Sequence, residues 1–562
     1  MKKMFAGNAG KKEAVYCLIL AAVAVFLSYL PYIERGIYLG ADSNFHLARM
    51  ESLADGLRNG VFPVKVHSEM CFGYGYGTGF FYSDIPLYFP ALLLLAGLSL
   101  VGAYKIFQLL LLAAVWGTTF YAGCRIMKRP LPAAAAASLV LLSARMMGSV
   151  YYVATLGHTM AMVFMPLAIV GCLLLLQGEK SWMLALGFIG LLLTHTISSV
   201  ITAAVCALLV LFYFDKVIGD YRIILRIALS AAVSLLSTIT WWLPMLEQMS
   251  VQTYKVSQPW TFVSENVCTL RNLVIGDYGT GIVITVALAI VILYVIVALV
   301  RREKVSRELI VLLIIALIFT GITIWPAFWR LTQPLLNFIQ FPYRFYFATT
   351  VLTAFAFGLI LNEVTDKIAC RKIKSPELLS GIVLAVTLVS AVTSYGYFPE
   401  SMFTGAREIY EGRKITQEVR GVGGGEEWLP LETSGNHFDT PTIAYDEAGS
   451  GAEGTKEKGD TIFTVYLNME KAYYDIPYVY YYGYRAYRED GTELSVVKGD
   501  RDGLVRVQLP EGGSGVEKIT VVYRKTNVQK AAYVIFALWI VAAGAVFLWK
   551  RCGKRVQRGR NA

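Results

Sequence analysis

Stretches of about 20 mainly apolar residues recur along most of this chain, and no other feature restricts its fold so strongly. A helix needs roughly that many apolar residues to cross the hydrocarbon core of a bilayer. Of the 562 residues, 56% are hydrophobic and only 16% are charged, and the mean hydropathy is +0.54. Soluble globular domains carry a larger share of charged residues. We therefore expect a polytopic α-helical membrane protein.

The apolar stretches alternate with basic loops in an order that predicts about twelve transmembrane helices. Lys and Arg are favoured in cytoplasmic loops, and the basic residues from Arg301 to Arg307 and from Lys367 to Lys374 fall there if the N-terminus is cytoplasmic. The same order predicts a cytoplasmic C-terminus and a multi-pass protein of the cell membrane. The expected spans are residues 14–31, 102–123, 131–149, 158–176, 182–196, 198–214, 225–245, 281–300, 309–325, 343–361, 378–396 and 531–549.

Residues 85–100 are also apolar but do not fit this order. Counting them as a span would place Arg125, Lys128 and Arg129 outside, against the preference for cytoplasmic basic residues. We expect an interfacial or re-entrant helix there, at the end of a long external loop over residues 32–100. The first span could instead be a signal peptide, but no small-residue cleavage site precedes Pro31, which favours a membrane anchor.

Residues 397–530 differ from the rest in being rich in Gly, Glu, Thr and Tyr. Residues 461–467 alternate in the manner of a strand, and Asp490-Gly491 and Asp502-Gly503 are typical of tight turns between antiparallel strands. We expect an external β-sandwich. The predicted domains are a transmembrane domain over 1–396, the external β-rich domain over 397–530, and a final transmembrane helix with a basic cytoplasmic tail over 531–562.

An acidic residue, Asp42, follows the first apolar span. Asp42, His46 and Arg49 are spaced four and three apart, so a helix beginning here would place all three on one face. That face would offer a base, an imidazole and a cation beside the bilayer surface, which is the chemistry needed to handle a lipid-linked phosphate. The alternative role of Asp42 is helix capping, which is compatible with catalysis. His46 and Arg49 could also be ordinary interfacial polar residues.

The segment from Gly73 to Asp84 alternates glycines with aromatic residues and includes Tyr82. Glycine lets backbone amides approach a ligand, and aromatic rings stack on sugar faces. Asp84 is a second acid in the same predicted external loop. A flexible connector is the other interpretation of such a loop.

Four polar residues fall near the predicted external ends of spans. Polar groups inside a membrane bundle cost free energy unless they are paired, and they often mark function. For His195, a single interhelical hydrogen bond is the simpler interpretation, and the same holds for Arg145. His158 is a candidate for substrate binding, and Arg344 could hold a lipid phosphate through bidentate hydrogen bonds or lie at the interface as a snorkelling side chain.

Several function classes receive no support from the sequence. The net charge of +11 arises mostly from loops and tails beside apolar spans, which gives no indication of nucleic-acid binding. No phosphate-binding loop, dinucleotide fingerprint or zinc-ligand spacing occurs in a suitable context, so no cofactor is assigned. Among the eight cysteines, Cys71 and Cys268 both fall in predicted external loops, where they could form a disulfide or remain two thiols.

Three blocks of sequence carry a resemblance to a known family. On these blocks the chain resembles the bacterial membrane proteins with the 6-pyruvoyl-tetrahydropterin synthase-related domain, a branch of the GT-C-type membrane glycosyltransferases. The blocks are Asp42-x3-His46-x2-Arg49 with Gly60–Pro63, Gly73–Tyr82 and Pro86–Tyr88; Gln340–Arg344; and Glu426–Pro430 with Tyr480–Tyr484.

The resemblance implies a sugar moved from a polyprenyl-phosphate donor to a cell-envelope glycan or lipid-linked acceptor by an inverting reaction. It places Asp42 where such enzymes carry the acid that activates the acceptor hydroxyl. Many of these enzymes have a second acid or a carboxylate pair that binds a divalent metal. In this chain Asp84 is the candidate for the second acid, and Glu51 and Asp55 are weaker candidates. Whether a metal is used stays open. Pterin chemistry is not implied, since the chain has no histidine cluster for a metal.

Two other functions remain alternatives. A transporter or flippase of a lipid-linked glycan would predict repeated halves and helices broken at mid-membrane, and the sequence shows neither. A non-catalytic envelope-assembly protein would use the β-domain as a docking surface.

Overall fold

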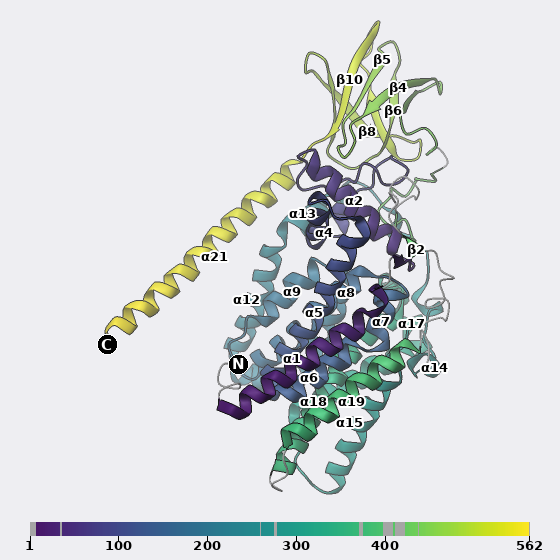
Figure 1. Cartoon of the computed structure of the whole chain (residues 1–562). Helices are drawn as coiled ribbons and strands as arrows, with labels where there is room; N and C mark the ends of the chain where they lie inside the picture. The colour runs from purple at the N-terminus through teal and green to yellow at the C-terminus, as the bar shows by residue number, and fades with distance from the viewer. Residues whose placement is uncertain are drawn as a thin grey trace. The chain divides into compact units, whose positions relative to one another are not determined.

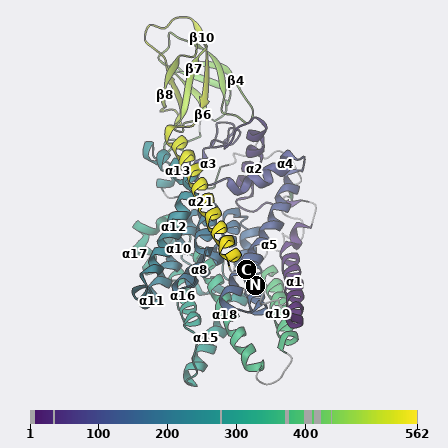
Figure 2. The same cartoon turned by 90° about the vertical axis from the view of Figure 1, so that its left-hand side faces the viewer.

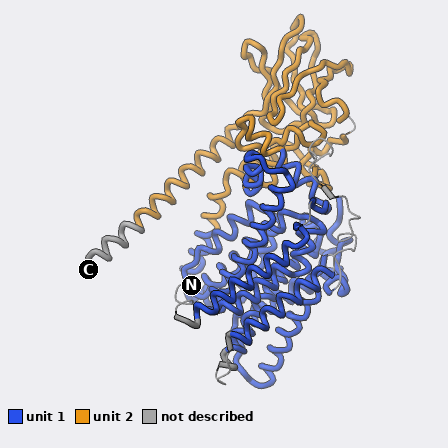
Figure 3. Tube along the Cα trace, in the orientation of Figure 1, with its two compact units in different colours: residues 1–51, 86–230, 259–415 blue, residues 52–85, 231–258, 416–562 orange. Residues whose placement is uncertain are grey.

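The computed structural model describes residues 7–33, 36–258, 260–274, 278–369, 375–396, 409–410, 422–435 and 438–560. They form two compact units, shown in different colours in Figure 3. Unit 1 comprises Met1–Glu51, Pro86–Ser230 and Pro259–Ile415, and unit 2 comprises Ser52–Ile85, Ala231–Gln258 and Thr416–Ala562. Of the basic clusters predicted to be cytoplasmic, Arg371, Lys372 and Lys374 lie outside the described residues.

Unit 1 is a helical bundle built around two almost entirely buried helices, α8 (Leu156–Leu176) and α18 (Phe345–Ala369). The helices packed around them, apart from the fully buried Pro130–Leu141 and Ala144–Tyr151, present long apolar side chains on the outside, as expected for a surface in contact with lipid. Figures 1 and 2 show α1 and α19 side by side, in agreement with their contacts. The surrounding helices are α1 (Gly7–Tyr29), α5 (Leu100–Met127), α6 (Pro130–Leu141), α7 (Ala144–Tyr151), α9 (Met183–Leu192), α10 (Thr196–Phe212), α15 (Ile282–Val300), α16 (Arg307–Thr323), α17 (Pro326–Leu336) and α19 (Ser375–Tyr395).

The predicted multi-pass helical fold is confirmed, with fewer full-length spans than expected. Among the described residues, seven helices are long and apolar enough to cross a membrane, or up to ten if each bent pair counts as one span. The predicted spans 182–196 and 198–214 correspond to α9 and α10, which have 10 and 17 residues and are shorter than the roughly 20 that a bilayer requires. Residues 85–100 contain the one-turn helix η2 (Ile85–Leu87) and the short helix α4 (Tyr88–Leu95), and α5 begins at Leu100.

Three of the predicted spans are broken. The predicted span 131–149 bends by 45° between α6 and α7, where the Ser143 hydroxyl accepts a hydrogen bond from the Met146 amide at 3.2 Å and caps a new helix. The predicted span 309–325 ends at an 88° bend, because Pro326 disfavours helical geometry at Trp325 and starts α17. A 72° bend separates α12 (Tyr221–Ser237) from α13 (Ile239–Val251). Hydropathy reports apolar runs and not helix continuity, so the sequence did not reveal these breaks.

The β-rich part of unit 2 is a closed eight-stranded antiparallel barrel, in the strand order β10-β5-β4-β3-β6-β9-β8-β7. The expected β fold is confirmed, but it closes into a barrel instead of forming a two-sheet sandwich, because β10 pairs with both β5 and β7. Both predicted turns are present, with positive φ at Gly491 and Gly503. The strands are β3 (Ile443–Asp446), β4 (Gly451–Lys456), β5 (Phe463–Asn468), β6 (Tyr473–Val479), β7 (Tyr484–Arg488), β8 (Glu493–Lys498), β9 (Leu504–Gln508) and β10 (Val516–Tyr523).

Unit 2 also contains chain segments from far outside the barrel. The stretch after helix α2 (Ser43–Arg58) belongs to it, and there the Tyr74 carbonyl accepts a hydrogen bond from the Val479 amide at 2.7 Å. Lys456 donates to the Pro477 carbonyl at 2.7 Å and to the Gly73 carbonyl, which ties the Gly-aromatic loop to the barrel strands. The last helix, α21 (Asn527–Arg560), follows β10 directly.

Candidate functional site

The two ends of α8 carry different chemistry. Beyond its C-terminus, Glu179 accepts hydrogen bonds from Arg125 at 3.0 Å and from Lys128 at 3.2 Å. Near its N-terminus lies His158. The 21 residues of α8 rise by about 30 Å, which matches the hydrocarbon thickness of a bilayer. Unit 1 therefore has two polar layers separated by one membrane thickness.

His158 is at the centre of the second polar layer. Its ring centroid lies 4.1 Å from that of His195 and 4.8 Å from that of Phe347. Its buried Nε2 has no hydrogen-bond partner among the described residues. Arg145, Arg344 and His46 act on it electrostatically in addition to His195. An unpaired polar atom buried in a membrane bundle marks a place for a ligand or an ordered water.

Arg145 is a second cation enclosed in this layer, with 1% of its surface exposed. It donates a hydrogen bond from Nη1 to the Tyr278 carbonyl at 3.0 Å, and its guanidinium carbon lies 5.7 Å, 5.0 Å and 4.9 Å from the ring centroids of Tyr278, Tyr343 and Phe347. No carboxylate among the described residues pairs with it. Three rings thus hold a cation that a bound anion would neutralise.

Asp42 directly precedes α2, as the predicted helix start requires. Its amide donates to the Val153 carbonyl at 2.9 Å, and its carbonyl accepts the first hydrogen bond of the helix from the His46 amide at 3.2 Å. A side chain at Gly40 would collide with Ala154, so this turn depends on a close backbone approach. Asp42 is half-buried and acts electrostatically on Tyr343.

His46 and Arg49 lie on the same face of α2, as their spacing predicts. The Arg49 Nη1 is 3.4 Å from the His46 Nδ1, and the Arg49 guanidinium carbon is 5.1 Å from the Phe45 ring centroid. Both side chains are almost completely buried.

Arg344 lies in the one-turn helix η6 (Pro342–Arg344), immediately before α18. It is half-buried and donates from Nη1 to the Ile339 carbonyl at 2.8 Å. It acts electrostatically on Arg145, His158 and His195. Unit 1 therefore brings Asp42, His46, Arg49, His158 and Arg344 into one polar layer, although they are widely separated in the sequence.

Asp84 and Tyr82 belong to unit 2. Asp84 is 5% exposed, and its Oδ2 lies 2.9 Å from Nε2 of the fully buried His67. Lys65 donates to the Gly79 carbonyl at 3.2 Å in the same cluster, and burial lowers the pKa of Lys65 to about 8 against the opposing effect of Asp84. The structure thus encloses the Asp84 carboxylate beside His67, a contact that the sequence did not indicate. Tyr82 is half-buried.

Most rings of the Gly-aromatic loop are core residues of unit 2. Tyr74, Tyr76, Phe80 and Phe81 are each at most 2% exposed. The Phe81 ring stacks on that of Trp428 with 4.7 Å between centroids. These four rings are therefore closed to a sugar, in contrast to the stacking that the loop composition suggested.

Arg145 and His195 are more prominent in the structure than the sequence indicated. His195 does make the expected local hydrogen bond, because its Nδ1 accepts from the Ser198 amide at 3.1 Å and caps α10. Its ring also faces His158. Tyr278 and Tyr343 were not anticipated as site residues; the only signal was the position of Tyr343 next to Arg344.

The described residues contain no group of three or more His, Cys, Asp or Glu side chains that could hold a metal ion. They do not fit a multi-ligand metal site, so no step proposed below uses a metal. Cys268 is a buried thiol in unit 1, which corresponds to the separate-thiol alternative.

A comparison with known proteins gives both a family and several structures. No curated protein sequence matches. Arabinofuranosyltransferase AftD from Mycobacteria matches with 17% identity and a TM-score of 0.45, over 71% of this chain and 27% of that one. The oligosaccharyltransferase AglB from Archaeoglobus fulgidus, solved with an inhibitory peptide and a dolichol-phosphate, matches with 14% identity and a TM-score of 0.40, over 71% and 56%.

The chain thus spans about a quarter of the length of the arabinofuranosyltransferase and a little over half of the oligosaccharyltransferase. The family model named 6-pyruvoyl-tetrahydropterin synthase related domain, described as a membrane protein, matches residues 80–398. This match covers more than half of the chain and includes α8, α18 and most of the polar layer around His158. The chain belongs to the 6-pyruvoyl-tetrahydropterin synthase related family of membrane proteins.

Proposed function

We propose that this protein is a GT-C-type membrane glycosyltransferase that moves a sugar from a polyprenyl-phosphate donor to a cell-envelope glycan or lipid-linked acceptor. One observation carries the proposal. A half-buried carboxylate, Asp42, lies in the same polar layer as Arg145 and Arg344, one membrane thickness from the layer of Arg125 and Lys128. A base beside a group of cations at the end of a membrane bundle suits a substrate with a phosphate at the bilayer surface.

The cations form the donor end of the proposed site. Arg344 carries a guanidinium at the mouth of α18, and a guanidinium can hold a phosphate by two parallel hydrogen bonds. Arg145 supplies a second positive charge that no described carboxylate neutralises. Arg49, His46, His158 and His195 add further polar groups in the same layer. The phosphate of the donor would therefore supply the negative charge that Arg145 lacks.

Asp42 is the proposed general base. The acceptor hydroxyl oxygen attacks the anomeric carbon and forms the new glycosidic bond, while the hydroxyl proton passes to the Asp42 carboxylate. The bond between the anomeric carbon and the phosphate oxygen breaks, and its electron pair leaves with the polyprenyl phosphate. A single displacement of this kind inverts the anomeric centre. Asp84 has no part in this scheme, because it is enclosed with His67.

The proposed orientation places the Asp42 layer outside the cell. Basic residues prefer the cytoplasmic side, and Arg125, Lys128 and Arg307 lie at the other end of the bundle, where Gln177 also donates to Glu308 at 2.7 Å. In this orientation the β-barrel is external and both termini are cytoplasmic.

A transporter or flippase of a lipid-linked glycan is the second candidate, and one observation favours it. The sequence showed no broken helices, but the structure contains three bent helix pairs, and discontinuous helices are typical of transport sites. The same geometry also suits a lateral entrance for a lipid donor, so the breaks do not decide between the two functions.

Purified protein in proteoliposomes, supplied with a polyprenyl-phosphate sugar and an acceptor, would test the proposal. Mass spectrometry would measure transfer, and accessibility of the lipid-linked sugar would measure translocation. We expect wild-type transfer and a loss of about 100-fold or more for Asp42→Asn, since a general base contributes roughly 10²–10⁴. Asparagine keeps the capping oxygen and the shape of the side chain.

The matched control is Asp220→Asn. Asp220 precedes α12 and accepts from the Arg222 amide at 3.0 Å, so the same substitution is made at another helix start. Full transfer by Asp42→Asn would refute the role of Asp42. Translocation without transfer would support the second candidate. If the protein showed neither transfer nor translocation, the non-catalytic assembly role would be the remaining function. Envelope glycans from cells with and without the protein would then identify the product.

A further inference from the structure

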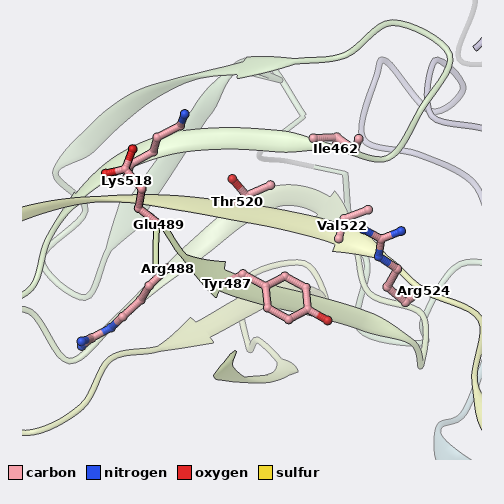
Figure 4. A pocket seen from close by; sticks show the side chains of 8 residues that line it. All are labelled: Ile462, Tyr487, Arg488, Glu489, Lys518, Thr520, Val522 and Arg524. Carbon is pink, nitrogen blue, oxygen red and sulfur yellow. The ribbon is translucent and has the colours of Figure 1, made fainter. Parts of the chain in front are cut away.

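The outer wall of the barrel has a hollow of about 260 Å³ where β7 meets β10. Side chains alternate across a strand, and Ile519 and Val521 point inward because both are fully buried. Lys518, Thr520, Val522 and Arg524 therefore share the outward side, as Figure 4 shows along the β10 strand. The hollow is lined by Ile462, Tyr487, Arg488, Glu489, Lys518, Thr520, Val522 and Arg524.

An aromatic ring lies beside this row of side chains. Tyr487 is the β7 partner of Thr520 in the strand register, so its half-buried ring is next to the Thr520 hydroxyl. In Figure 4 the Tyr487 ring lies below Thr520 and Val522, and Arg488 points away from the other side chains. The hollow thus combines a flat ring, a hydroxyl and two basic side chains on one face.

Lys518 and Arg524 differ from Arg488, the third basic side chain of the hollow, which pairs with Glu517 at 3.4 Å. Neither the Lys518 amine nor the Arg524 guanidinium makes a hydrogen bond or ion pair with any described residue. Four other cations of unit 2 are paired with acids at 2.7–2.8 Å: Arg485 with Glu493, Arg506 with Asp475, Lys498 with Glu432 and Lys471 with Asp446. The two positive charges of the hollow are therefore available for an external anion.

We propose that this hollow binds a sugar residue that carries a carboxylate or phosphate group. Aromatic rings stack on the apolar face of sugars, so Tyr487 provides the platform. Lys518 and Arg524 pair with the anionic group, for which a guanidinium is well suited. Thr520 and Glu489 are placed to bond sugar hydroxyls. The volume lies below the roughly 300–1,000 Å³ of drug-sized sites, which favours a single sugar residue.

An anionic lipid surface fits the hollow less well. Peripheral membrane binding needs long apolar side chains that insert beside the basic ones. Here the apolar members are Ile462 and Val522, and Val522 is 4% exposed. The proposal concerns binding alone and does not depend on the transfer reaction, so its failure and that of the proposed function are separately observable.

Binding by the full-length protein in zwitterionic nanodiscs would test this site. The probes are trigalacturonate, mannose 6-phosphate, a neutral galactose trimer and vesicles of phosphatidylglycerol. We expect trigalacturonate or mannose 6-phosphate to bind at least about tenfold more tightly than the neutral trimer. The double variant Lys518→Gln/Arg524→Gln should lose about tenfold in affinity for the acidic sugars, and Tyr487→Ala should weaken binding as well.

The matched control is Lys458→Gln/Lys498→Gln, which removes the same charge from paired lysines of unit 2 outside the hollow. It should leave sugar binding unchanged. Equal binding of the neutral trimer, no binding of either acidic sugar, or an equal loss in both double variants would overturn the proposal. Binding to anionic vesicles that depends on Lys518 and Arg524, without binding of acidic sugars, would assign the hollow to lipid instead. Circular dichroism would verify that each variant is folded.

Discussion

A buried arginine usually has a carboxylate partner, because an uncompensated charge in a low-dielectric interior is costly. Arg145 instead has a carbonyl and three aromatic rings. Cation–π contacts and one hydrogen bond offset part of that cost. The uncompensated positive charge of Arg145 acts on His158 and Arg344 in the same polar layer. At the residue scale, a bound anion would therefore be stabilised in this layer.

Arg344→Ala should weaken donor binding more than it slows the chemical step. The guanidinium is proposed to contact the phosphate in the ground state and in the transition state alike, so its removal raises KM while kcat changes little. We expect KM to rise about tenfold, as for the loss of one charged hydrogen bond. Arg344→Lys should give an intermediate KM, because lysine keeps the charge and loses the bidentate geometry.

The control for this variant is Arg301→Ala, an exposed arginine that follows α15. Steady-state kinetics with varied polyprenyl-phosphate sugar would separate KM from kcat. A large fall in kcat with unchanged KM would contradict the donor-binding role of Arg344.

Lys456 should make the stability of the barrel pH-dependent. Burial lowers the pKa of Lys456 from 10.5 to about 7. Between these values the unfolded chain binds a proton that the folded barrel does not, so stability rises as pH increases from about 7 toward 10.5 and is lost as pH falls through that window. The rise from pH 7 to 9 should be about 2 kcal/mol for an ideal single site.

Differential scanning fluorimetry of the purified protein would follow the barrel transition against pH. Lys456→Met keeps the length of the side chain, removes the titration and should flatten part of the profile. Lys65, whose pKa burial lowers to about 8, contributes to the same window and should account for much of the remainder. If barrel stability depended on pH in the same way in the Lys456→Met protein, Lys456 would be charged in the folded barrel over this pH range.

Two helices of unit 1 touch backbone to backbone through glycine. A Cβ at Gly171 of α8 would lie 2.2 Å from the Leu184 amide of α9, and a Cβ at Gly187 of α9 would lie 2.6 Å from the Ala168 amide. Small residues let helices approach closely where lipid supplies no hydrophobic driving force. At the element scale this contact fixes α9 against α8, which is almost entirely buried.

Gly171→Ala should destabilise unit 1 by several kcal/mol, because the clash is with backbone atoms that cannot move aside. The matched control is Gly117→Ala in α5, where nothing lies within 4 Å of the new methyl group. That change should be neutral or stabilise by up to about 1 kcal/mol, since alanine has the higher helix propensity. Thermal unfolding and detergent size-exclusion profiles would measure both. Equal stability of the two variants would contradict a tight backbone contact between α8 and α9.

At the scale of the whole molecule, each compact unit joins segments that are far apart along the chain. Unit 1 takes Asp42 from the start of α2 and Arg344 from the start of α18, while unit 2 joins residues 52–85 to the barrel. The family match covers the middle of the chain and both units contribute to it. The proposed membrane orientation is inferred from the distribution of charge over the loops.

Site-directed labelling in intact cells would test that orientation. In a cysteine-free background, Leu270→Cys should react with a membrane-impermeant maleimide, whereas Lys304→Cys should react only after the cells are opened. Both positions are exposed, and they lie in loops with opposite predicted locations. The positive-inside rule provides the expectation, because Arg301, Arg302 and Lys304 cluster in one short loop. The reverse labelling pattern would invert the topology and remove Asp42 from the external face.

The sequence by itself determined the features that depend on local pattern. Apolar runs predicted the membrane bundle, alternating residues with Asp-Gly turns predicted an antiparallel β fold, and the spacing of Asp42, His46 and Arg49 predicted the face of α2. These predictions were correct because the periodic spacing of hydrophobic residues and the residue preferences of turns are set within a few residues of the chain. The roles assigned to the site residues remain predictions.

Only the tertiary structure decided which distant residues meet. Closure of the barrel depends on the pairing of β10 with β7, and the enclosure of Asp84 depends on His67. Arg145 was undervalued because its significance lies in the rings of Tyr278, Tyr343 and Phe347, which reach it from other segments. Burial and pairing are properties of the packed chain, and no local pattern in the sequence encodes them.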